Sequence, residues 1–375
     1  MGFLKGTISF SRCRVTGEAP GSFSDFFDRQ LKKYAFQEPA AGADEKSIGW
    51  TSLENILDTQ FQTADYAVGA YLLFCLRIDR KAVPPALLRV RLLEGEQRAL
   101  HGTEKTRLSK DGRRKLKESL QEDLLKKAHP VPSFHEILWA PSRERLLFGS
   151  LSRKVFMDFE DLFKVSFRHS LKPYLPWDTA FLDSTTARKI ASLSKGFTLE
   201  TENPPERQTD ASFLGREFLT WLWFKSEERN GRIAVPGKDD VEVHFLRRVV
   251  LESGAGEYSE TVVCQGLHAD LREGKAALRE GKRVREARIE LKRESQDWEF
   301  TFKADPFQFQ SMRLPASAGE NEEASDREGL ILERIYRIEA AMKTMDDLFD
   351  FFLRRRLSLQ WASEEVPRLK RWLSL

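Results

Sequence analysis

The sequence predicts an α+β protein of several domains, built from small antiparallel sheets with packed helices. Its 375 residues exceed the usual size of one domain, and a 41% hydrophobic content with 27 Phe is ample for buried cores. Strand-like and helix-like segments alternate along the chain without an internal repeat. Three scattered cysteines, Cys13, Cys75 and Cys264, cannot form a disulfide framework or a thiolate metal cage, which indicates a reducing cytoplasm.

Residues 1–175 are expected to form an N-terminal α+β domain with a projecting basic helix. A first helix begins at Ser22 or Ser24, because the apolar residues that follow are spaced as on one helical face. A second begins at Pro84-Pro85, since proline is tolerated in a first turn, and ends near residue 100. Two more helices are expected over 109–128 and 154–169, and strands over 3–11, 71–78, 133–139 and 145–151.

Residues 176–314 are expected to form a central α+β domain. Its helices are predicted over 178–194, 211–226 and 268–278, and its strands over 240–251 and 258–266, which would pair. A β-hairpin follows, in which Ala287, Ile289 and Leu291 share one face and Trp298 to Phe302 supply the other strand. The aromatic helix at 213–224 is interpreted as core, with a partner groove as the alternative.

The end of the chain is predicted to be helical. An acidic linker over 315–328 precedes a C-terminal segment, 329–375, whose pattern reads as one long helix to about residue 360 and a short amphipathic piece after Pro367. The longest apolar run has 11 residues, too few to cross a bilayer, so no membrane association is expected.

Charge is segregated along the chain, although 61 Lys and Arg nearly balance 58 Asp and Glu. Residues 105–127 hold nine basic and four acidic side chains, and residues 272–293 hold the same numbers. These two segments therefore carry +10 together, which leaves −7 on the rest of a chain whose net charge is +3. Separate basic segments on an otherwise acidic chain indicate a protein that binds nucleic acid. The alternative is that the two segments are merely solvated faces of helices.

Twelve side chains are the candidate DNA contacts. Lys110, Arg113, Arg114 and Lys117 share one helical stripe, so the first half of that helix should project and the second half should pack. No helix-turn-helix, zinc-finger or RNA-recognition signature that would read base edges occurs, so the binding should be insensitive to sequence. The full candidate set is Lys105, Arg107, Lys110, Arg113, Arg114, Lys117, Arg279, Lys282, Arg283, Arg285, Arg288 and Lys292.

Two other classes of function stay open. Glu290 and Lys292 have the Glu-x-Lys spacing of a Mg²⁺-dependent nuclease half-site, with Asp270 upstream, although alternating charge is also expected on a solvated strand face. Alternatively, the basic segments bind an acidic protein instead of DNA. Motifs for nucleotide binding or a nucleophilic serine are absent from the sequence, and we expect neither a cofactor, a metal nor an enzyme.

The order of these features resembles that of the RdgC family of bacterial recombination-associated proteins, across nearly the whole chain. The resemblance rests on Phe36 and Gly49-Trp50, on the Pro84-Pro85 helix, and on the segment from Lys105 to Lys110. Further matching features are Leu116-Lys117-Glu118, Trp139, Leu267 to Leu271, Gly274-Lys275 and the hairpin through Phe302. Segment 195–266 and the tail after about Leu353 are longer than the family pattern.

The resemblance implies a non-enzymatic homodimer that closes into a ring around duplex DNA and limits the action of RecA. Such a protein would be cytoplasmic and associated with the nucleoid, with single-stranded DNA as a second candidate ligand. If about 6–10 phosphates are neutralised, the logarithm of the binding constant should fall against log salt with a slope of about −5 to −9.

Overall fold

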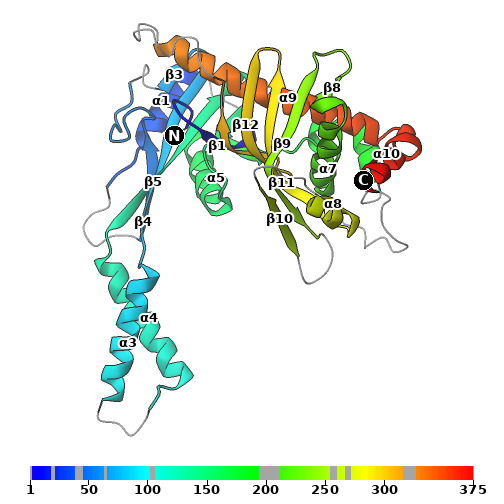
Figure 1. The fold of residues 1–375 in the computed structure, drawn as a ribbon. Helices are drawn as coiled ribbons and strands as arrows, with labels where there is room; N and C mark the ends of the chain where they lie inside the picture. The colour runs from blue at the N-terminus through cyan, green and yellow to red at the C-terminus, as the bar shows by residue number, and fades with distance from the viewer. Residues whose placement is uncertain are drawn as a thin grey trace.

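The computed structural model describes residues 2–17, 22–38, 45–62, 66–101, 106–193, 211–253, 260–266, 272–315 and 327–374. Within them the strands form one antiparallel path in the order β10-β9-β11-β12-β13-β1-β6-β5-β4-β2, with β3, β7 and β8 paired beside it (Figure 1). The α+β class is therefore confirmed, but the expectation of small separate sheets is wrong. The domain boundaries proposed from the sequence stay a prediction.

Strand β1 joins the two halves of this path. Its first half pairs with β13, as Ile8 lies opposite Met312 and Phe10 opposite Phe309. Its second half pairs with β6 and β7, as Cys13 lies opposite both Leu146 and Pro173. Strands from the first 175 residues and from the central segment thus lie in one hydrogen-bonded array.

The N-terminal elements follow the expected order, with corrections. The strand expected over 3–11 begins five residues later, because Phe3 is buried in a turn in which the Gly2 amide donates to the Lys5 carbonyl. Strands β2, β3 and β7 were not predicted. The strands are β1 (Ile8–Thr16), β2 (Lys46–Thr51), β3 (Ala67–Val68), β4 (Tyr71–Lys81), β5 (Pro130–Ala140), β6 (Arg145–Phe148) and β7 (Ser170–Pro173). The helices are α1 (Phe23–Lys33), α3 (Pro85–Leu100), α4 (Lys110–Lys127) and α5 (Arg153–Phe167), all predicted.

The helices and strands of the central segment also agree in part with the prediction from the sequence. The helix expected over 178–194 is divided into a 3₁₀ turn and a helix that starts after Asp183, whose carboxylate accepts hydrogen bonds from the Thr185 and Thr186 amides. Strands β8 and β13 were not predicted, while the pairing of β9 with β10 is confirmed. The strands are β8 (Arg232–Ile233), β9 (Val241–Glu252), β10 (Thr261–Gln265), β11 (Arg283–Arg293), β12 (Gln296–Lys303) and β13 (Gln308–Arg313). The helices are α6 (Ser184–Ala191), α7 (Phe213–Glu227), α8 (Arg272–Arg279), α9 (Arg327–Arg356) and α10 (Val366–Ser374).

Helix α7 is core, as interpreted. Eleven of its 15 residues are buried, because sheet strands contact one side and α9 and α10 contact others. Phe218 lies 5.3 Å from Phe349 of α9 and 6.5 Å from Phe302 of β12 between ring centroids. The buried Glu217 carboxylate accepts from the Arg356 guanidinium at 2.8 Å.

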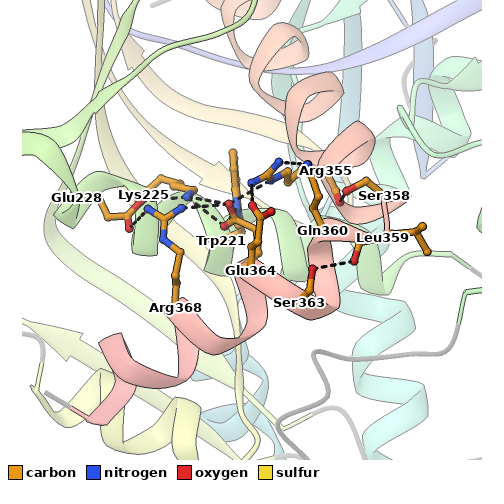
Figure 2. Close-up of polar contacts among 11 residues, drawn as sticks. Trp221, Lys225, Glu228, Arg355, Ser358, Leu359, Gln360, Ser363, Glu364 and Arg368 are labelled. Carbon is orange, nitrogen blue, oxygen red and sulfur yellow. Dashed lines mark hydrogen bonds and ion pairs between the residues drawn. The ribbon is translucent and has the colours of Figure 1, made fainter.

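The C-terminal segment completes this core. A π-helical turn over Trp361–Glu365 links α9 to α10, and its Glu365 carboxylate lies 3.0 Å from the Lys225 ammonium of α7. Arg368 of α10 reaches Glu228 at 2.6 Å, and Figure 2 shows these groups converging between α7 and the chain end. The tail that exceeds the family pattern therefore covers the aromatic helix.

Helix α9 crosses the whole sheet, as Figure 1 shows along its upper edge. Asp346 of α9 binds the buried Arg12 of β1 at 2.9 Å through both oxygens. The same guanidinium lies 4.4 Å from the centre of the Tyr174 ring. Near the other end of α9, Arg334 donates to the carbonyl oxygens of Gly2 and Phe3.

Candidate nucleic-acid interface

Helices α3 and α4 form an arm that projects from one end of the sheet, carried by the paired strands β4 and β5 (Figure 1). The hydroxyl of Ser109 caps α4 by accepting from the Gly112 amide at 3.1 Å. No residue of α4 is buried, and α3 buries only Leu92 and Gly95. The arm therefore offers its side chains to solvent.

Both halves of α4 belong to the arm, so the expectation that only its first half projects is wrong. The leucines of α4 pack on α3, because Gly95 lets the two helices approach closely. A Cβ at Gly95 would lie 3.2 Å from Leu116 and 3.4 Å from Leu120. A hairpin held by so few apolar contacts is exposed on nearly all sides.

A groove of about 500 Å³ lies between the two helices. One wall is cationic, with all four members on the predicted stripe of α4. The other wall is mostly aliphatic and repeats the same i, i+3, i+4, i+7 spacing on α3. The groove is lined by Lys110, Arg113, Arg114 and Lys117 of α4, and by Pro85, Leu88, Arg89 and Leu92 of α3.

The cations of the arm are exposed and weakly engaged. Arg113 pairs with Glu96 of α3, and Arg114 pairs with Asp111 at 3.1 Å, with guanidinium side chains 59% and 65% exposed. Such surface pairs contribute about 0–1 kcal/mol, so a phosphate can replace either acid. Lys110 and Lys117 have no ion-pair partner among the described residues.

Two further candidates precede α4 in the sequence. Arg107 is exposed in the connection before α4, while Lys105 lies outside the described residues. Arg89 was not among the candidate residues, although it stands on the groove's opposite wall. The spacing of Pro85, Leu88, Arg89 and Leu92 was visible in the sequence and was the signal that could have found this wall.

The second basic run lies far from the arm, toward the α8 end of the sheet (Figure 1). Its cations are largely neutralised by acids that neighbouring elements bring to them. Arg285 pairs with Glu252 of β9 at 2.8 Å, and Arg288 pairs with Glu299 of β12 at 2.8 Å. Lys292 pairs with Glu290 at 3.2 Å.

Lys282 and Arg283 are also held within the protein. Lys282 is buried, and its ammonium group donates to Glu280 at 3.0 Å and lies 3.2 Å from Glu260. These hydrogen bonds raise the pKa of Lys282. Arg283 donates to the carbonyls of Gly281 and Lys282. Arg279 is exposed at the end of α8 and has no ion pair among the described residues.

The nuclease half-site is only partly described. Glu290 and Lys292 lie on the outer face of β11, because Ala287, Ile289 and Leu291 alternate into the core. Their mutual ion pair occupies both groups. Asp270 and the family-like segment 267–271 lie outside the described residues. Within the described ranges, no three His, Cys, Asp or Glu side chains form a group that could hold a metal.

A comparison with known protein families finds a match to the part of the chain that contains the arm. Residues 14–179 match the family model described as "Putative exonuclease, RdgC", which includes all of α3 and α4. This part of the chain is similar to the RdgC family. The RdgC match ends close to residue 175, where the first predicted domain ends, and the longer C-terminal remainder lies beyond it.

No curated protein matches the chain. Across the described part of the chain, the helices are too short or too polar to cross a membrane.

Proposed function

We propose that this protein binds duplex DNA through its phosphates and takes part in homologous recombination. The observation that carries the proposal is the cationic wall of α4, whose four side chains stand exposed on a projecting arm. The RdgC match supports it, because it covers the arm and belongs to a recombination-associated family. The paired cations of the second run give it less support.

The chemistry of the arm favours contacts to the DNA backbone. Lysine and arginine side chains bind phosphates, which position a protein without specifying a sequence. Together with Arg89 on the α3 wall and Arg107 before α4, the four side chains of the α4 wall make six candidate phosphate contacts on one arm. Each neutralised phosphate contributes about −0.9 to the slope of the logarithm of the binding constant against log salt, so these contacts account for a slope of about −5.

A matched pair of charge reversals tests this proposal. Lys110→Glu with Lys117→Glu removes two unpaired cations from the groove, and we expect weaker binding to all duplex sequences and a salt slope reduced by about 2. Lys126→Glu with Lys127→Glu makes the same charge change in the last turn of α4, outside the groove. Fluorescence anisotropy with two unrelated duplexes, at several salt concentrations, measures both.

Equal losses of DNA affinity in the two double variants would show that DNA is attracted by the net charge of the arm alone. No binding by the unchanged protein at low salt would contradict the proposal and favour an acidic protein as the partner.

We further propose that the protein is a homodimer whose arms help to close a ring that limits the action of RecA. Leu87, Val90 and Leu93 of α3 are 39–51% exposed, and none of them lines the groove. A two-fold axis would bury this apolar stripe against its own copy. The ring and the role toward RecA are what the resemblance to RdgC proteins implies, and the family match over residues 14–179 agrees with that resemblance.

Leu93→Asp tests the dimer. Two like charges at a two-fold contact repel, so we expect dissociation to monomers at micromolar concentration in light scattering. An unchanged protein that is itself monomeric would contradict the ring. The non-enzymatic role is tested separately with Glu290→Ala, since Mg²⁺-dependent cleavage of DNA that disappears in this variant would establish the nuclease alternative.

A further inference from the structure

The groove of the arm has two chemically different walls. Leu88 and Leu92 with Pro85 present aliphatic surface on α3, while the α4 wall is entirely cationic. Each wall runs from position i to i+7 of its helix, a length of about 10 Å. A ligand that satisfies both walls must be apolar on one side and anionic on the other.

A nucleic acid strand uses the α4 wall and, on the α3 wall, only Arg89. Phosphates are attracted to the lysines and arginines, but they gain nothing from leucine and proline. Bases stack on aromatic rings, and none of the eight residues that line the groove is aromatic. The aliphatic side chains Pro85, Leu88 and Leu92 therefore have no role in the DNA contact proposed above.

An extended acidic peptide uses both walls. Side chains of an extended chain alternate between two sides, so a segment in which aspartate alternates with a large apolar residue is anionic on one side and apolar on the other. A 10 Å wall spans about three residues of such a chain. Its carboxylates would meet Lys110 and Lys117, and its apolar side chains would meet Leu88.

We propose that the groove between α3 and α4 docks an acidic segment of a partner protein with alternating apolar residues, and that this segment competes with DNA for the arm. The competition rests on the proposed function, because both ligands use the α4 wall. The docking itself does not, because it depends on Leu88 and the rest of the α3 wall.

Two peptides of equal charge test the docking in the full chain. One labelled peptide repeats Asp-Leu four times and the other repeats Asp-Ser four times. We expect the Asp-Leu peptide to bind about tenfold more tightly in fluorescence anisotropy, since only it buries apolar surface on α3. We also expect it to displace a duplex from the arm.

The variant Leu88→Gln distinguishes binding of the acidic peptide from binding of DNA. Leu88 is an uncharged, half-buried residue of the groove, so we expect the variant to bind both peptides equally weakly and duplex DNA within about twofold of the unchanged protein. Leu88→Met keeps the aliphatic wall and should retain the peptide preference. Circular dichroism of both variants confirms that the arm remains helical.

Equal binding of the two peptides by the unchanged protein, or an unchanged preference in Leu88→Gln, would overturn the docking proposal. A loss of single-stranded DNA binding in Leu88→Gln would also overturn it, in favour of a nucleic acid strand in the groove. If duplex DNA fails to bind while the peptide preference holds, the proposed function fails and the docking stands.

Discussion

At the residue scale, the carboxylate of Asp347 in α9 is engaged by three cations. It lies 2.9 Å from Arg293 and 3.1 Å from Lys343, and it also contacts Lys238. Burial raises the pKa of Asp347, but the hydrogen bonds from these three cations outweigh it and hold the pKa below the usual value of 3.8. A carboxyl group whose pKa is lowered by folding stabilises the protein above its unfolded pKa.

The pairing of Asp347 with these cations predicts that the stability of the protein depends on pH. The contribution of Asp347 is fully present above about pH 4 and is lost as pH falls through the lower pKa of the folded state. Asp347→Asn leaves three cations without their carboxylate and should cost about 3 kcal/mol at neutral pH. Its stability should then change less between pH 7 and pH 3 than that of the unchanged protein.

Urea unfolding followed by tryptophan fluorescence across this pH range measures the difference. Asp297→Asn is the control, because Asp297 is exposed and has no ion pair among the described residues. An equal pH response in both variants would contradict the role of Asp347.

The two basic runs differ in the acidic partners that folding brings to their cations. The cations of α4 are exposed, as their helical spacing indicated. In the second run, Glu252 and Glu299 come from β9 and β12 to neutralise Arg285 and Arg288. A window of sequence cannot include partners that lie 11 to 33 positions away and become neighbours only through strand pairing.

At the element scale, the position of α7 depends on one glycine. A Cβ at Gly215 would lie 2.3 Å from the Ala304 carbonyl oxygen and 2.7 Å from the Trp177 ring. Gly215→Ala therefore forces α7 away from the β12–β13 turn, and we expect a loss of about 3 kcal/mol in the free energy of unfolding. Gly266→Ala is the control, since no atom of the described residues lies within 4 Å of its Cβ position.

The denaturation midpoints of the two variants measure this effect. A Gly215→Ala protein as stable as Gly266→Ala would show that α7 does not pack against the turn as described.

Helices were easier to predict than short strands. Phe23, Phe26 and Phe27 carry a clear helical period, and α1 begins where they do. Strand β13 lacks the alternation of a strand, because a bulge with Ser311 at φ 50° brings both Phe309 and Met312 into the core. Strand β2 was missed because its last three residues are all buried, which also removes the alternation.

At the scale of the whole molecule, the arm should be its least stable described part. Helix α3 has 16 residues with two buried, whereas α7 has 15 residues with eleven buried. Local unfolding requires little free energy where few apolar contacts are lost. We therefore expect amides of α3 and α4 to exchange hydrogen faster than those of α7, and duplex DNA to slow exchange in the arm alone.

Hydrogen exchange read by mass spectrometry tests both statements, with α7 as the internal reference. Equal protection of α3 and α7 would contradict the description of the arm as a separate, lightly packed unit. Protection that appears in α7 upon addition of DNA would place the contact elsewhere.

The sequence predicted the local elements of the whole molecule but not how they join. Nothing in residues 8–16 indicates that this strand pairs with both β13 and β6, because strand pairing depends on partners distant in sequence. The projection of the arm was partly foreseen from its basic stripe. Its extent follows from β4 and β5, which continue their pairing to Lys81 and Pro130 before the helices begin.

The shared strand β1 also sets an order of events during synthesis. Its partners in β6 and β7 leave the ribosome by residue 173, but Met312 follows Ile8 by 304 positions. At about 5–20 residues per second, the first half of β1 waits about 15–60 s for β13. During that interval an N-terminal chain carries an unpaired strand edge with Phe10 uncovered, and truncated products that end before β13 keep it permanently.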